Sequence, residues 1–259
     1  MFNRSKKGRL IAIANQKGGV GKTTTAINLS TAMASVDKKV LLIDLDPQGN
    51  ATTGLGIDVK NRNPGVYELF CESTAFKKVV RDTIIPGLSI IPSTQDLSAI
   101  ELELVNMTDR AKRLLQYKDK LIYGYDYIFI DCPPSLGLLT VNALTAANSV
   151  LVPLQCEFFA LEGLTQLLKT VDRVKGGFNK NLIMEGIVLT MYDRRNKLSS
   201  EVENDVRKHF GKGVFETKIP RNVRLSEAPS HGLPAILYDL QAPGSQAYIE
   251  LVKEILGKR

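Results

Sequence analysis

Two lysines, three glycines and two adjacent threonines stand together near the start of the chain. The run is Lys17-Gly18-Gly19-Val20-Gly21-Lys22-Thr23-Thr24, and it follows an apolar stretch at residues 10–14. Glycines permit a tight turn whose amides point at phosphate oxygens, and a threonine hydroxyl is a ligand that Mg²⁺ accepts. The run therefore predicts a phosphate-binding loop, in which Lys22 reaches the terminal phosphates and Thr23 ligates the metal.

Two aspartates each end an apolar run. Asp44 closes residues 39–44 and Asp131 closes residues 127–131. Ligands bind beyond the carboxyl ends of parallel strands, so we expect both carboxylates beside the phosphate loop. There a carboxylate can hold a metal-bound water or orient the attacking one. Each aspartate taken alone is equally well explained as a turn or helix-cap residue. The role of Asp46 stays open between a dimer interface and a turn.

Apolar runs alternate with helical patterns along the chain. Continuous runs predict strands buried on both faces at residues 10–14, 39–44, 127–131, 149–153 and 185–189. Helices are expected at residues 23–36, from Ser135 to residue 144, and at 246–256, with another helix starting at Asn63-Pro64. This alternation predicts an α/β fold: a mainly parallel, twisted sheet with helices on both faces. We expect one domain over residues 1–259, with two or three short helices within residues 50–109.

Composition and charge restrict the partners. The chain has 259 residues, of which 44% are hydrophobic and 24% charged, and no apolar run is long enough to span a membrane. The three cysteines are scattered, which is typical of reduced thiols in a cytosolic protein. Residues 194–224 hold nine bases and four acids, a net charge of +5. A second basic segment, expected to be flexible, covers residues 1–8. This pattern suits a polyanion such as DNA, an acidic membrane, or simply a solvated face.

The phosphate loop departs from the general Walker A pattern, because Gln16 stands where that pattern has its first glycine. With its extra lysine, the run resembles the deviant Walker A motif of a family that includes ParA/Soj partition ATPases, MinD, the nitrogenase iron protein and the arsenite-pump ATPase. The resemblance implies a P-loop NTPase that binds ATP and Mg²⁺ through residues 17–24. It also implies that Lys17 crosses a dimer interface to the partner's nucleotide, that Asp44 positions the hydrolytic water, and that Asp131 binds Mg²⁺ through water. The alternative for Lys17 is a solvated surface lysine.

A second segment carries the most specific resemblance. Residues 218–232 closely resemble the chromosomal Soj subgroup, and residues 188–198 form a second basic-flanked segment after an expected strand. The resemblance implies that Pro220 and Asn222 contact the adenine. It also implies that Arg195 and Arg224 carry sequence-independent DNA binding in the dimer, which phosphate contacts alone can supply. The alternative for each arginine is a surface ion pair with one of three nearby acids: Glu201, Glu203 or Asp205.

The resemblance as a whole covers residues 9–256. It implies a cytoplasmic ATPase that forms a homodimer with ATP, binds double-stranded DNA on the nucleoid, and segregates chromosomes or plasmids. A centromere-binding partner of the ParB/Spo0J type is expected to stimulate hydrolysis. No stable membrane association is expected.

Three other classes compete. A membrane-surface ATPase like MinD would need a terminal helix that docks on lipid. An apolar stripe at helical spacing does occur near the end of the chain, although packing on the sheet explains it better; it comprises Tyr248, Ile249, Leu251, Val252, Ile255 and Leu256. Iron–sulfur chemistry needs paired cysteines, which this chain lacks. A small-molecule synthetase with a related phosphate loop stays open.

Overall fold

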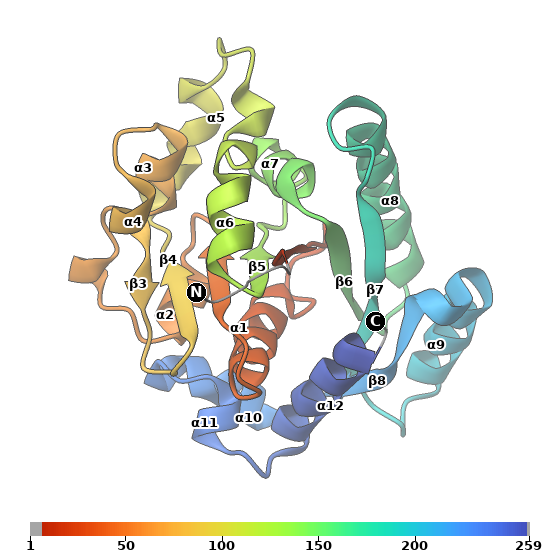
Figure 1. Ribbon diagram of the computed structural model, residues 1–259. Coiled ribbons are helices and arrows are strands. Elements are labelled where there is room, and N and C mark those ends of the chain that lie inside the picture. Colours follow the sequence, from red (N-terminus) through yellow and green to blue (C-terminus); the bar gives the residue numbers. More distant parts are fainter. Residues whose placement is uncertain (1–6, 258–259) are drawn as a thin grey trace.

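The computed structural model describes residues 7–257, and within them eight strands form one sheet. The order is β3-β4-β2-β5-β1-β6-β7-β8, with β3 and β8 at opposite edges (Figure 1). All neighbouring strands are parallel except β3 and β4, so the expected mainly parallel sheet is confirmed. The strands are β1 (Arg9–Ile13), β2 (Val40–Asp44), β3 (Arg81–Asp82), β4 (Leu88–Ile91), β5 (Tyr127–Asp131), β6 (Ser149–Gln155), β7 (Ile183–Tyr192) and β8 (Val214–Pro220).

Helices cover both faces of this sheet. Successive residues of β1 face opposite sides, so Leu10 and Ala12 enter one apolar cluster while Ile11 and Ile13 enter the other. One face carries α1 (Lys22–Ala34), α2 (Asn50–Gly54), α10 (Val223–Glu227), α11 (Ala235–Tyr238) and α12 (Pro243–Gly257). The other carries α3 (Val66–Phe70), α4 (Phe76–Val79), α5 (Ile100–Glu103), α6 (Lys118–Gly124), α7 (Leu138–Ala146), α8 (Ala160–Gly177) and α9 (Lys197–Phe210). Burial on both faces explains why the central strands lack polar alternation.

Two expected helix starts were wrong. The helix expected from Asn63-Pro64 begins only at Val66, because the Glu68 carboxylate accepts the Gly65 N–H at 2.6 Å and caps that point. The helix expected from Ser135 begins three residues later, at Leu138. A glutamate from another element, Glu101, accepts the Leu138 N–H at 2.7 Å. Both starts are therefore set by a carboxylate.

Residues 50–109 hold more structure than the pattern indicated. They contain α2, α3, α4 and α5, and also the strands β3 and β4, which were not expected. Strand β4 pairs with β2 in parallel and extends the sheet by one buried strand. Its four residues, Leu88–Ile91, are too few for a periodic signal to stand out.

The two ends of the chain bear on two further expectations. The basic segment expected to be flexible, residues 1–8, lies outside the described residues except for positions 7 and 8. Near the other end, the apolar stripe of α12 packs against the sheet, with Tyr248, Leu251 and Ile255 at most 1% exposed. Among residues 7–257, no helix has both the length and the apolar character needed to cross a bilayer.

Candidate nucleotide site and basic surface

The phosphate loop connects β1 to the start of α1. Gly19 and Gly21 have φ angles of +76° and +87°, in the left-handed region where a side chain would be strained. Helix α1 begins at Lys22 after Gly21, and no side chain caps its first turn. The free amides at this helix start can therefore bind an anion.

Three hydrogen bonds hold the loop in this shape. The Thr190 hydroxyl donates to the Val20 carbonyl at 2.8 Å, which ties the loop to β7. The Asn15 side chain donates to the Pro153 carbonyl at 2.7 Å and accepts the Lys17 N–H at 3.0 Å. Hydrogen bonds within the chain therefore hold the loop in this shape.

Lys22 bends back over the loop. Its ammonium donates to the Lys17 carbonyl at 3.0 Å, and the residue is 7% exposed. Burial lowers the pKa of Lys22, while the negative charge of Asp131 acts in the opposite direction. A buried ammonium with one carbonyl partner suits an anionic ligand in the loop.

Asp44 and Asp131 both end strands, as expected, and they lie side by side. They are direct register partners between β2 and β5, and both are fully buried. Asp44 accepts hydrogen bonds from the Thr52 amide at 2.8 Å and from the Thr52 hydroxyl at 2.7 Å. Burial raises the pKa of Asp44 to about 6, although the Thr52 hydrogen bonds oppose this.

The Asp131 carboxylate has no comparable support. Neither of its buried oxygens has a partner in hydrogen-bonding geometry within residues 7–257. Burial, and next the charge of Asp44, hold the pKa of Asp131 well above its usual range, while the nearby Thr23 hydroxyl lowers it. An unpartnered buried carboxylate beside a threonine hydroxyl is a donor set that suits a hard cation such as Mg²⁺.

Two neighbouring cavities lie beside the loop. The first, of about 570 Å³, surrounds the loop at Gly18, Gly19, Gly21, Lys22, Thr23 and Thr24. The second, of about 430 Å³, is lined by Pro220 and Asn222, and it shares Gly21, Thr24 and Met191 with the first. The buried Asn222 amide oxygen there has no hydrogen-bond partner among the described residues. The predicted phosphate-binding residues and the predicted adenine contacts therefore line neighbouring cavities with three residues in common.

Some of the expected residues lie outside these cavities, and others line them unexpectedly. Lys17 is not among the lining residues, and its ammonium forms an ion pair with Glu157. Neither Asp44 nor Asp131 is among the lining residues, whereas Asp46 lines the cavity at the phosphate loop. Sequence reasoning did not single out Thr52 or Met191. Met191 has a φ of +49°, a strained value for a side chain, at the junction of the two cavities.

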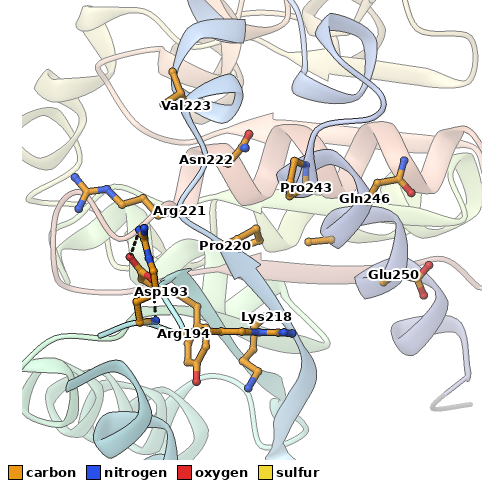
Figure 2. A pocket seen from close by; sticks show the side chains of 13 residues that line it. Asp193, Arg194, Lys218, Pro220, Arg221, Asn222, Val223, Pro243, Gln246 and Glu250 are labelled. Carbon is orange, nitrogen blue, oxygen red and sulfur yellow. Dashed lines mark hydrogen bonds and ion pairs between the residues drawn. The ribbon is translucent and has the colours of Figure 1, made fainter. Parts of the chain in front are cut away.

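The basic segment borders a third pocket, of about 770 Å³, which shares Pro220, Arg221 and Asn222 with the second cavity. Figure 2 shows its basic side chains on one side and the α12 residues Gln246 and Glu250 on the other. Arg195 is 90% exposed in its side chain and forms a bidentate pair with Asp193, at 3.0 and 2.9 Å. Within residues 7–257, Arg194 and Arg221 have no carboxylate within 4 Å.

Arg224 does not line that pocket. It lies on α10 and pairs with Glu227 at 2.9 Å and with Asp239 at 3.2 Å. The acids considered as partners for Arg195 and Arg224 were therefore the wrong ones. Glu203, for instance, pairs with other bases, namely Arg207 and Lys218.

Known proteins resemble this chain over nearly its whole length. The family model described as "AAA domain" matches residues 8–184. The chromosome partitioning protein ParA of Caulobacter vibrioides is 55% identical over 252 residues, or 96% of this chain and 94% of the relative. The sporulation initiation inhibitor protein Soj of Bacillus subtilis is 51% identical over 248 residues, covering 96% and 98%.

A solved structure agrees with these relatives. The cobyrinic acid a,c-diamide synthase of Mycobacterium smegmatis, with a bound ATP analogue and magnesium, superimposes with a TM-score of 0.86. It is 36% identical and covers 96% of this chain and 94% of its own. The phosphate loop and the paired aspartates agree with relatives that are 51–55% identical over nearly the full length, and the chain belongs to the ParA/Soj family of chromosome-partitioning ATPases.

Proposed function

We propose that this protein, as a single domain over residues 1–259, is an ATPase that dimerises on ATP, and that the dimer binds double-stranded DNA without sequence preference. Its role is chromosome or plasmid segregation in the cytoplasm, with the ATP-bound dimer on the nucleoid. One observation carries the proposal: in a chain 55% identical to a partitioning protein, the cavity at the phosphate loop shares lining residues with the neighbouring cavity at Pro220 and Asn222.

In this proposal ATP lies along the two neighbouring cavities at the phosphate loop and at Pro220. The amides of residues 17–24 and the Lys22 ammonium hold the phosphates, and the base lies at Pro220 with its amino group donating to Asn222. Thr23 and, through water, Asp131 hold Mg²⁺, which when bound neutralises phosphate charge. The orphaned oxygens of Asp131 and Asn222 support this placement, because each would gain a partner from the ligand.

Asp44 has the catalytic role: it orients the water that attacks the terminal phosphate. Thr52 fixes its carboxylate with two hydrogen bonds, and the Asp46 amide donates to it at 3.3 Å. These contacts position the carboxylate behind the loop and leave Asp46 as the acid that lines the cavity. Lys22 balances the charge that develops on the phosphate oxygens.

Dimerisation involves Lys17. In the single chain its ammonium pairs with Glu157, and both side chains are partly exposed, at 40% and 32%. An exposed ion pair is weak, so the triphosphate of a second subunit competes readily for this ammonium. Lys17 therefore completes the partner's site in the ATP-bound dimer. A ParB/Spo0J-type partner stimulates hydrolysis and ends that state.

DNA binding is assigned to the basic surface that comprises Arg194, Arg195, Arg221 and Arg224. Arg195 and Arg224 contact backbone phosphates in the dimer. Arg194 and Arg221 add cations that have no carboxylate within 4 Å among residues 7–257. Two such surfaces on one dimer raise the effective affinity, which couples DNA binding to ATP. Each lost phosphate contact is expected to reduce the salt dependence of binding by about one unit of the logarithmic slope.

The proposal is tested by measuring DNA binding of separate Arg195→Ala, Arg221→Ala and Arg224→Ala variants with ATP, across a salt series. We expect weaker binding and a shallower salt slope, while sedimentation still shows an ATP-dependent dimer. Arg173→Ala is the control, because Arg173 is exposed on α8 away from this surface. Equal loss in Arg173→Ala, or unchanged binding in all variants, contradicts the assignment.

Neither the membrane-surface ATPase nor the small-molecule synthetase has a comparable observation in its favour. A MinD-like lipid-docking helix would need its apolar face free, whereas the apolar stripe of α12 is packed against the sheet. A synthetase activity has the M. smegmatis structure as its support, at 36% identity against 55% for the Caulobacter ParA. Liposome co-sedimentation with ATP and the wild-type protein separates the membrane alternative from DNA binding.

A further inference from the structure

A fourth pocket, of about 830 Å³, lies far from the nucleotide site. Its walls come from α4, from β3, from the end of α6 and from the residues that precede β2 and β5 (Figure 1). Lys39 and Tyr125 thus stand at the amino-terminal ends of strands whose carboxyl ends carry Asp44 and Asp131. Five extended residues span about 15 Å, so the full length of a strand separates the two sites.

The lining combines aromatic rings with cations. Phe76 and Tyr125 are half-buried and Tyr123 is exposed, and together with Val80 they form an apolar wall. Three lysines surround this wall, and a single acid, Asp82, is also present; the lysines are Lys39, Lys77 and Lys120. The pocket therefore carries a local charge of +2.

The three lysines form no ion pair within the part of the chain that the structure describes. Within residues 7–257, no carboxylate lies within 4 Å of any of their ammonium groups. Two of them contact rings instead: the Lys39 ammonium lies 5.1 Å from the centre of the Tyr125 ring, and that of Lys120 lies 5.5 Å from Tyr117. Tyr117 in turn stacks on Phe76 at 5.9 Å. Rings position these cations without neutralising them.

We propose that this pocket binds an acidic peptide segment of a partner protein. Carboxylates of the peptide pair with Lys39, Lys77 and Lys120, and one aromatic or large apolar side chain packs against Phe76, Val80 and Tyr123. A concave pocket of this volume holds a few side chains, whereas a DNA duplex presents a convex surface that the aromatic wall does not match. Asp82, in the same wall, also disfavours a row of phosphates.

Such a site leaves the nucleotide cycle undisturbed. No residue of this pocket lines the cavities at the phosphate loop or the basic pocket. The protein can therefore hold an acidic partner at one end of the sheet while ATP and DNA occupy the other. This proposal does not depend on the function proposed above, because neither ATP nor DNA enters it.

The test uses a fluorescent synthetic peptide of aspartates and glutamates around a central phenylalanine, titrated with the full chain in an anisotropy assay. Combined Lys39→Gln, Lys77→Gln and Lys120→Gln substitutions are expected to weaken binding about tenfold or more, because three ion pairs are lost. ATP hydrolysis is expected to stay unchanged. The matched control neutralises three exposed lysines on and after α8, namely Lys169, Lys175 and Lys180, and is expected to stay within about twofold of the wild type.

The aromatic contact has its own arm. Replacing the central phenylalanine of the peptide by glycine is expected to weaken binding to the wild type, and to make little difference to a Tyr123→Ala variant. The proposal is overturned if the wild type does not bind the peptide, or if the α8 control loses as much affinity as the pocket variant. It is also overturned if duplex DNA binding falls in the pocket variant as steeply as peptide binding, since the site would then serve nucleic acid.

Discussion

Replacing Asp131 by asparagine is expected to stabilise the nucleotide-free protein while removing most of the stabilisation that magnesium and ATP provide. Asp131 is fully buried next to Asp44, and neither of its oxygens has a hydrogen-bond partner among the described residues. An unsatisfied buried charged group costs about 1–3 kcal/mol or more. Asn keeps the shape and removes the charge, so we expect the free energy of unfolding to rise by about 1–3 kcal/mol at pH 7.

The sign of the pH dependence follows from the same burial. Because folding raises the pKa of Asp131, the carboxyl costs nothing below its unfolded pKa and destabilises the fold increasingly as pH rises toward the folded pKa. The stability difference between Asp131→Asn and the wild type is therefore expected to grow from acid toward pH 7. Urea unfolding at a series of pH values, without nucleotide or magnesium, measures it.

Ligand and control complete this test. At a hundredfold excess over the dissociation constant, magnesium–ATP stabilises a binding-competent protein by about 2.7 kcal/mol, and Asp131→Asn is expected to lose most of that gain. Asp126→Asn is the control, since Asp126 precedes the other end of β5 and accepts the Lys39 N–H at 2.8 Å. We expect it to lose about 1 kcal/mol and to keep the ligand response. An Asp131→Asn variant that is destabilised like this control, or that gains as much from magnesium–ATP as the wild type, refutes the reasoning.

Three further outcomes follow from single contacts. Thr52→Val removes a hydroxyl that donates to Asp44 and accepts the Ser93 N–H. Urea unfolding should therefore show a free energy of unfolding lower by about 2–4 kcal/mol, and ATP hydrolysis should slow. The control, Thr53→Val on the exposed side of α2, should change both quantities little. Burial raises the pKa of Glu203, but three hydrogen-bond donors outweigh it and lower this pKa to about 2. Glu203→Gln should therefore reduce the free energy of unfolding by about 2–3 kcal/mol at pH 7, and this loss should vanish as the pH falls from about 4.5 toward 2. Asn222→Leu removes the buried amide oxygen, so the Michaelis constant for ATP should rise about tenfold or more and the preference for ATP over GTP should be lost. An unchanged ratio of the Michaelis constants for ATP and GTP would contradict a contact between Asn222 and the base.

The sequence alone predicted what depends on local patterns. Continuous apolar runs correctly predicted the central strands, because strands buried on both faces need no polar alternation. The glycine-rich run correctly predicted the loop before α1, because positive φ angles at Gly19 and Gly21 demand those residues. The positions of Asp44 and Asp131 at the carboxyl ends of strands were also predicted, whereas the strand order and register that make them neighbours were not.

What the sequence could not predict depends on contacts between distant segments. Thr52 is an ordinary helix residue until the fold brings its hydroxyl to Asp44. The pairing of Arg195 with Asp193 is local, yet that of Arg224 with Asp239 requires α10 and the residues after α11 to meet. The pocket around Lys39 and Tyr123 likewise joins segments that are far apart in the chain.

Sedimentation of the Asp44→Ala variant, with and without ATP and plasmid DNA, tests the central claim most directly. This variant is expected to bind ATP without hydrolysing it, so the dimer accumulates. The account predicts a monomer without nucleotide, a dimer with ATP, and co-sedimentation with DNA only when ATP is present. A protein that stays monomeric at saturating ATP, or that binds DNA equally well without ATP, contradicts it.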